Sequence, residues 1–283
     1  IGGWAFSNCN GLTNVIMPNS VTSIGGHAFY DCSSLTSIAI SESVTSIERG
    51  VFWGCSNLTN IVIPKNVTSI GEYAFLGCSS LVSIEMPESV INIGDGAFYS
   101  CSSLVNLAIP ESVTSIGNEA FNGCSGLASI VIPESVTSIK NGTFSGCSNL
   151  TNIVIPKGVT DIGDYAFASC GNLASVEIPE SVTSIGKGAF RYCYGLTSVV
   201  IPKGITSISE GAFFECGGLI NIVLPESVAT IGRSAFSACR RLSSITIPES
   251  LTSIDEEAFL DCHILYQIVN RSDIQLTIGD ESN

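Results

Sequence analysis

The chain has 283 residues, of which 45% are hydrophobic and only 13% are charged. Its longest apolar runs, as at residues 61–64, are far shorter than the ~20 residues of a transmembrane helix, so we expect no membrane insertion. The net charge of −14 repels nucleic-acid phosphates and anionic lipids, which argues against both as partners. Residues 1–4 carry no basic segment followed by an apolar stretch, so we expect any signal peptide to lie outside this sequence.

The chain repeats with a period of 23 residues. Its twelve cysteines recur at that spacing from Cys9 to Cys262, and twelve of the thirteen phenylalanines and all ten prolines follow the same period. The period defines a partial unit at residues 1–11, eleven full units at 12–264 and a degenerate last unit at 265–283. We interpret the last unit as a C-terminal cap or a linker.

Each unit contains three predicted elements. A short β-strand, as at residues 127–132, is rich in β-branched residues and ends at a proline that cannot extend a hydrogen-bond ladder. A second extended segment follows, as at 136–139, and a glycine such as Gly117 after it allows a turn with positive φ. Residues such as 189–193 have apolar spacings of three and four that predict one helical or 3₁₀ turn.

Eight positions of each unit are predicted to point inward: Leu, Ile, Ile, Val, Ile, Ala, Phe and Cys. A unit of 23 residues cannot close a core by itself, so neighbouring units must stack and merge these positions into one continuous core. The predicted fold is therefore a single repeat solenoid over residues 1–264 rather than two domains.

The strand pattern Leu-x-x-Ile-x-Ile resembles that of leucine-rich repeats. The continuation Ile-Pro-x-x-Val-x-x-Ile-Gly-x-x-Ala-Phe-x-x-Cys is similar to the BspA-like subclass, and the resemblance covers residues 1–264. It implies a leucine-rich-repeat solenoid in a secreted or cell-surface protein, and several relatives act as adhesins for host matrix proteins. These implications concern the fold and the class of protein rather than any particular site.

The cysteine column permits more than one chemistry. Equivalent Cα atoms of stacked units lie about 5 Å apart, which is within disulfide range. Their side chains should nevertheless point in parallel into the core, where a free thiol behaves as a small apolar group. Consecutive cysteines are always 23 residues apart, without the close pairs typical of metal sites. We expect buried free thiols and no metal.

The sequence contains no pattern typical of an enzyme or of cofactor binding. Its only histidines, His27 and His263, are about ten units apart and cannot share a site. Nucleophile elbows, phosphate-binding loops and zinc-protease motifs are absent from the sequence. We expect neither catalytic residues nor a cofactor.

The fifth strand position should point outward, because side chains alternate along a strand. This position is mostly apolar: Ile16, Ala39, Val62, Glu85, Ala108, Val131, Val154, Glu177, Val200, Val223, Thr246 and Val269. The stripe indicates either an interaction face or plain β-propensity, and we weigh the two equally. As candidate ligand-binding residues we take Val62, Val131, Val154, Val200 and Val223, together with the polar Asn60, Asn152 and Asn221.

A second candidate surface follows the phenylalanine column. Tyr30, Trp53 and Tyr99 stand directly after a phenylalanine, and aromatic side chains are favoured anchors at interfaces. The alternative interpretation is that these rings fold back over the turn.

Two hypotheses for function follow. The first is a non-catalytic extracellular or cell-surface module that binds a protein or a glycan along its strand face. The second is a structural spacer or self-assembling stalk without a specific ligand. An N-terminal unit that starts with core residues and without a polar cap also predicts end-to-end self-association.

Overall fold

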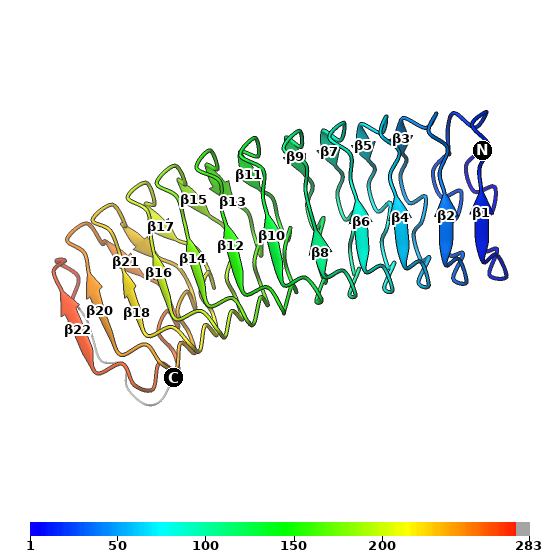
Figure 1. The fold of residues 1–283 in the computed structure, drawn as a ribbon. Helices are drawn as coiled ribbons and strands as arrows, with labels where there is room; N and C mark the ends of the chain where they lie inside the picture. Colours follow the sequence, from blue (N-terminus) through cyan, green and yellow to red (C-terminus); the bar gives the residue numbers. More distant parts are fainter. Residues whose placement is uncertain (276–283) are drawn as a thin grey trace.

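The computed structural model describes residues 1–275 and shows a row of stacked coils with the N-terminus at one end (Figure 1). Each coil contributes one strand to a first row of parallel strands and, in most coils, a shorter strand to a second row. The first row consists of β1 Asn14–Ile16, β2 Ser37–Ala39, β4 Asn60–Val62, β6 Ser83–Glu85, β8 Asn106–Leu107, β10 Ser129–Val131, β12 Asn152–Val154, β14 Ser175–Glu177, β16 Ser198–Val200, β18 Asn221–Val223, β20 Ser244–Ile247 and β22 Gln267–Asn270. The outer surface of this row is called the strand face below.

The second row lies beside the first and its strands have two residues each. They are β3 Ser46–Ile47, β5 Ser69–Ile70, β7 Asn92–Ile93, β9 Ser115–Ile116, β11 Ser138–Ile139, β13 Asp161–Ile162, β15 Ser184–Ile185, β17 Ser207–Ile208, β19 Thr230–Ile231 and β21 Ser253–Ile254. Every pairing in both rows is parallel and joins residues 23 positions apart, such as Val62 with Glu85. The repeat solenoid predicted from the 23-residue period is confirmed.

Prolines end the strands of the first row. The amide of Ile63 still donates a hydrogen bond to the carbonyl of Glu85 in the next coil, at 3.4 Å, but Pro64 has no N–H to continue the ladder. The chain then turns, and the amide of Val67 donates to the Pro64 carbonyl at 3.0 Å. This turn places the residue after each proline at one edge of the strand face.

The core is built from columns of identical side chains. The ten phenylalanines from Phe29 to Phe236 are fully buried, and the ring centroids of successive members of the column lie 5.2–5.8 Å apart. Phe6 in the first coil is 41% exposed, because no preceding coil covers it in residues 1–275. A buried position therefore depends on neighbours on both sides, as expected for a solenoid.

The helical or 3₁₀ turn predicted at residues 189–193 is wrong. This segment is a series of tight turns, with positive φ at Gly188 (58°) and Tyr192 (62°). The amide of Phe190 donates to the carbonyl of Ala212 in the next coil at 2.9 Å instead of to its own turn. Left-handed residues on both sides prevent a helix from propagating, and the same two columns have positive φ in every coil.

The predicted role of Gly117 is also incorrect, because the positive φ lies two residues later, at Glu119 (54°). Glycine in this column instead permits close approach of neighbouring coils. At the equivalent Gly186, an added Cβ would lie 2.5 Å from the backbone nitrogen of Asp164. No side chain fits in that space.

The cysteines are free thiols, as predicted. Those from Cys32 to Cys239 are buried, whereas Cys9 is exposed and Cys262 is half-buried. Each buried thiol donates a hydrogen bond to a phenylalanine carbonyl of the preceding coil, as Cys55 Sγ does to Phe29 at 3.2 Å. Burial raises the pKa of the Cys55 thiol to about 12.

The last described strand extends the first row by one coil. Residues of β22 pair in register with β20, as Ser244 does with Gln267. All four residues of β22 are exposed on the outermost coil of the described chain. Residues 276–283 of the predicted cap or linker, including Ile278, lie outside the described residues. Among residues 1–275, no helix has the length and apolar character required to cross a membrane.

Candidate functional site

The strand face displays the predicted apolar stripe. The alternation along β4 buries Ile61, which is 3% exposed, and leaves Val62 63% exposed. Val131, Val154, Val200 and Val223 are each more than 60% exposed. All five valines proposed from the sequence therefore point outward on the same surface.

Strand register brings the members of the stripe together. Val131 pairs with Val154, Val154 with Glu177, Glu177 with Val200, and Val200 with Val223. The stripe is therefore continuous over five successive coils, β10 to β18, apart from a single carboxylate. A contiguous exposed apolar surface of this kind is characteristic of contact sites.

The predicted asparagines flank the stripe on the same strands. Asn60, Asn152 and Asn221 are exposed and stand two residues before Val62, Val154 and Val223. The Oδ1 of Asn60 accepts a hydrogen bond from Ser83 Oγ at 3.3 Å.

The amides of Asn152 and Asn221 make no side-chain hydrogen bond within residues 1–275. Their donors and acceptors are therefore accessible to a ligand that lies on the stripe.

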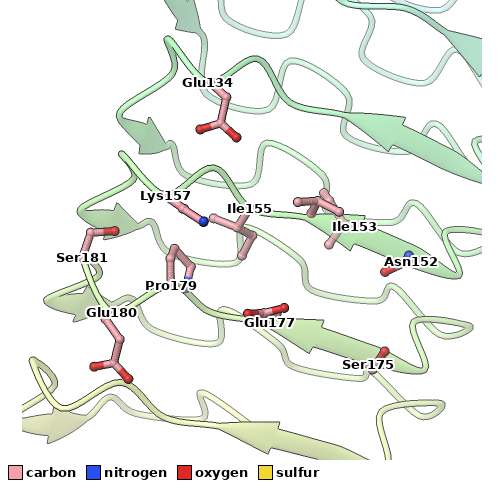
Figure 2. Close-up of a pocket in the computed structure, with 11 residues that line it drawn as sticks. Glu134, Asn152, Ile153, Ile155, Lys157, Ser175, Glu177, Pro179, Glu180 and Ser181 are labelled. Atoms are coloured by element: carbon pink, nitrogen blue, oxygen red, sulfur yellow. The ribbon is translucent and has the colours of Figure 1, made fainter.

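A groove hollows the strand face between β12 and β14. It has a volume of about 590 Å³, and its floor contains the buried Ile153 and Ile155 and the half-buried Pro179. Figure 2 shows Lys157 between Glu134 of the preceding coil and Glu177 and Glu180 of the next. The groove thus combines an apolar floor with charged groups at its rim, a combination that the sequence did not predict.

The residue after each proline, with Glu42 after Ser41 at the same position of its unit, forms a charged edge beside the stripe. It is called the post-proline column: Asn19, Glu42, Lys65, Glu88, Glu111, Glu134, Lys157, Glu180, Lys203, Glu226 and Glu249. Ion pairs within 4 Å in the described chain are found mainly on the turns, as between Arg49 and Glu72 at 2.6 Å. In the post-proline column only Glu226 has such a partner, Arg271 at 3.7 Å. Most carboxylates at this edge are therefore free to meet an external charge.

The aromatic candidates separate into two groups. Tyr30 and Trp53 are half-buried and pack edge to face, with ring centroids 5.4 Å apart. Tyr99 is also half-buried but belongs to no aromatic pair in the described chain. The structure thus brings together two of the three predicted aromatic residues.

Three further rings join Tyr30 and Trp53, and sequence reasoning missed them. Trp4 stacks on His27 with centroids 4.2 Å apart, and Tyr73 lies 5.7 Å from Trp53. Burial, with a smaller effect from the Arg49 charge, lowers the pKa of His27. Trp4, His27 and Tyr73 share a column three residues before that of Tyr30 and Trp53, so the common 23-residue spacing was the available signal.

A second aromatic cluster, also missed, surrounds Arg191. Its guanidinium lies 4.7 Å from the ring centroid of Tyr192 and 4.5 Å from that of Phe214, within cation–π range. Its Nη2 donates a hydrogen bond to the Tyr192 hydroxyl at 2.9 Å. These contacts use the guanidinium to join two coils.

The described residues contain no group of three or more His, Cys, Asp or Glu side chains arranged to hold a metal ion. His27 lies in the aromatic cluster at one end of the molecule, and His263 is exposed in the last full unit. The two histidines that the sequence offers are thus in separate surroundings.

The chain is structurally similar to bacterial leucine-rich-repeat proteins. A protein from Bacteroides ovatus superposes with a TM-score of 0.79 at 33% identity, covering 96% of this chain and 77% of that one. A leucine-rich cell-surface protein from Faecalibacterium prausnitzii superposes with a TM-score of 0.61 at 32% identity, covering 96% and 83%. The pneumococcal vaccine antigen PcpA shares the fold alone, with a TM-score of 0.59 at 19% identity, covering 92% and 68%.

Comparison of the sequence gives a consistent result. No curated protein matches the chain significantly. The family model of the BspA-type leucine-rich repeat region, six copies long, matches residues 1–91, 69–197 and 160–282, and so covers nearly the whole chain. The 23-residue coils, the phenylalanine and cysteine columns and this match agree: the chain belongs to the BspA-type leucine-rich repeat family.

Proposed function

We propose that this chain is a non-catalytic interaction module at the cell surface or outside the cell. It binds a protein or glycan partner along its strand face and acts in adhesion. The observation that carries the proposal is the continuous outward stripe around Val131, Val154 and Val200, flanked by exposed asparagines. Solenoids generally bind through such extended surfaces.

The location is supported by relatives. The Faecalibacterium prausnitzii protein, 32% identical over 96% of this chain, is described as a leucine-rich cell-surface protein. Exposed asparagine amides beside an apolar stripe suit a partner that offers both apolar surface and hydrogen-bonding groups. A protein or a glycan of the extracellular matrix has this chemistry.

The test is binding of the purified chain to immobilised extracellular-matrix proteins and glycans. A strand-face variant carries Val131→Glu, Val154→Glu and Val200→Glu. A matched control carries Ile91→Glu, Thr137→Glu and Thr206→Glu, which adds the same charge at exposed positions beside the second row of strands. We expect the strand-face variant to lose binding and the control to retain it, with circular dichroism unchanged in both.

Each other result has a distinct meaning. Equal binding by the two variants would exclude the strand face as the contact surface. Absence of binding to every member of the panel would instead favour the structural spacer. Growth of the scattering mass with protein concentration would favour a self-assembling stalk.

A further inference from the structure

We propose that the strand face docks an extended basic segment of a partner protein through two equivalent grooves four coils apart. The proposal rests on the proposed function and specifies the chemistry of the protein partner. The first groove contains Glu42, Val62, Lys65 and Glu85, and the second contains Glu134, Val154, Lys157 and Glu177.

The two grooves are copies of one arrangement. Six of the seven residues that line the first groove have an identical counterpart in the second groove 92 positions later, which is four units of 23, as for Lys65 and Lys157. The apolar floor is repeated as well, with Ile63 and Pro87 in the first groove and Ile155 and Pro179 in the second. Their volumes are about 350 and 590 Å³.

Strand pairing places a carboxylate next to an exposed valine in both grooves. Val62 is in register with Glu85, and Val154 with Glu177. Glutamate is depleted in strands, and within residues 1–275 it occupies the fifth strand position only at these two sites. β-Propensity explains the valines of the stripe but not these glutamates.

Although each groove also contains a lysine, the groove carboxylates form no ion pair with it in the described chain. In the described chain, none of Glu42, Glu85, Glu134 and Glu177 lies within 4 Å of a cationic group. On the turns, by contrast, Glu210 pairs with Lys187 of the neighbouring coil at 2.9 Å. The groove carboxylates therefore remain available to an external cation.

The charge of the surface selects the partner. The stripe and the post-proline column together carry nine glutamates against three lysines. Two copies of this surface would repel each other, and the surface would also repel an anionic lipid or a nucleic acid. A segment with lysine or arginine complements the carboxylates, while its apolar side chains can cover the valines.

The separation of the grooves sets the spacing of the ligand. Stacked strands are about 4.8 Å apart, so four coils span roughly 20 Å. An extended chain rises about 3.3 Å per residue, so two basic groups about six residues apart reach both grooves. Once one basic group occupies a groove, the binding of the second group in the other groove is intramolecular, which strengthens the overall affinity.

The test uses three synthetic peptides in fluorescence anisotropy with the whole chain. The first has two Lys-Arg pairs six residues apart, the second has one pair, and the third has the two pairs replaced by Glu-Asp. We expect the two-pair peptide to bind roughly tenfold tighter than the one-pair peptide, the acidic peptide not to bind, and binding to weaken as salt is raised. Equal affinity for the one-pair and two-pair peptides would overturn joint use of the grooves.

Matched variants locate the contact. The double variant Glu85→Gln and Glu177→Gln should weaken the two-pair peptide by about fivefold, since exposed charge pairs are individually weak. The control Glu119→Gln and Glu256→Gln removes the same charge from exposed turn positions and should change affinity less than twofold. Equal weakening by both variants would show non-specific attraction and refute the grooves.

The two proposals can fail separately. The matrix partner tests the valines of the stripe, whereas the basic peptide tests Glu85 and Glu177, which the Val→Glu strand-face variant leaves in place. If no basic peptide binds but the matrix partner still needs Val131, Val154 and Val200, the grooves are refuted and the proposed function stands.

Discussion

The phenol ring of Tyr165 lies over Gly188 of the next coil, where an added Cβ would be 2.6 Å from the ring atom Cε1. Gly188 also has a φ of 58°, in the left-handed region that disfavours a side chain. Tyr73 covers Gly96 in the same way four coils earlier. An aromatic residue over a glycine of the next coil is thus a recurrent means of closing the turns.

We predict that Gly188→Ala destabilises the solenoid by about 1–3 kcal/mol, because it adds both backbone strain and a clash with Tyr165. Gly217→Ala is the control, since nothing lies within 4 Å of its added Cβ and its φ is not in the left-handed region. Urea unfolding followed by circular dichroism measures both variants. Equal unfolding midpoints for the two variants would contradict the prediction.

The phenylalanine column predicts a large effect of truncation in the middle of the solenoid. Phe121 is fully buried between Phe98 and Phe144, with centroid distances of 5.5 and 5.6 Å. Phe121→Ala should cost about 3–5 kcal/mol, as expected for a cavity in a packed core. Phe6→Ala should cost clearly less, because Phe6 is 41% exposed. Guanidinium unfolding midpoints compare the two, and similar losses would argue against a continuous core.

The thiols should differ sharply in reactivity. Burial raises the pKa of Cys124 to about 12 and that of the half-buried Cys262 to about 11. Because the thiolate is the nucleophile, alkylation of the native chain at pH 8 should label the exposed Cys9 first and Cys262 more slowly. Cys124 should react only after denaturation.

Peptide mass spectrometry after timed labelling assigns each site. A Cys9→Ser variant should lose only the fast phase. Rapid native labelling of Cys124 would show that the core opens easily, contrary to the packing seen here.

Much of this fold follows from the spacing of residue types. The columns of Phe29 and Cys32 and the outward position of Val62 follow from the 23-residue period and from strand alternation. The helical turn at residues 189–193 failed because apolar spacing does not report the sign of φ. The glycines Gly50, Gly96, Gly142, Gly188 and Gly211, which recur in this column, were the signal that it adopts a left-handed conformation.

The candidate site was predicted less completely. The stripe and its asparagines were found from the sequence, and Glu85 and Glu177 were regarded only as interruptions of it. The repeat spacing already placed each of these glutamates one coil after a valine at the same strand position and after a lysine of the post-proline column. The free carboxylates and the hollow around Val154 became visible only with the side chains in place.

The sequence by itself determined the solenoid, its inward columns and its family, because a repeat of fixed length stacks identical residues on one another. The tertiary structure alone decided the path of the turns, the aromatic cluster that contains Trp4, His27 and Tyr73, and the depth of the grooves. These features depend on contacts between coils, where backbone φ and side-chain rotamers adjust to the neighbouring coil. Such adjustment is a property of the packed neighbours rather than of any single unit.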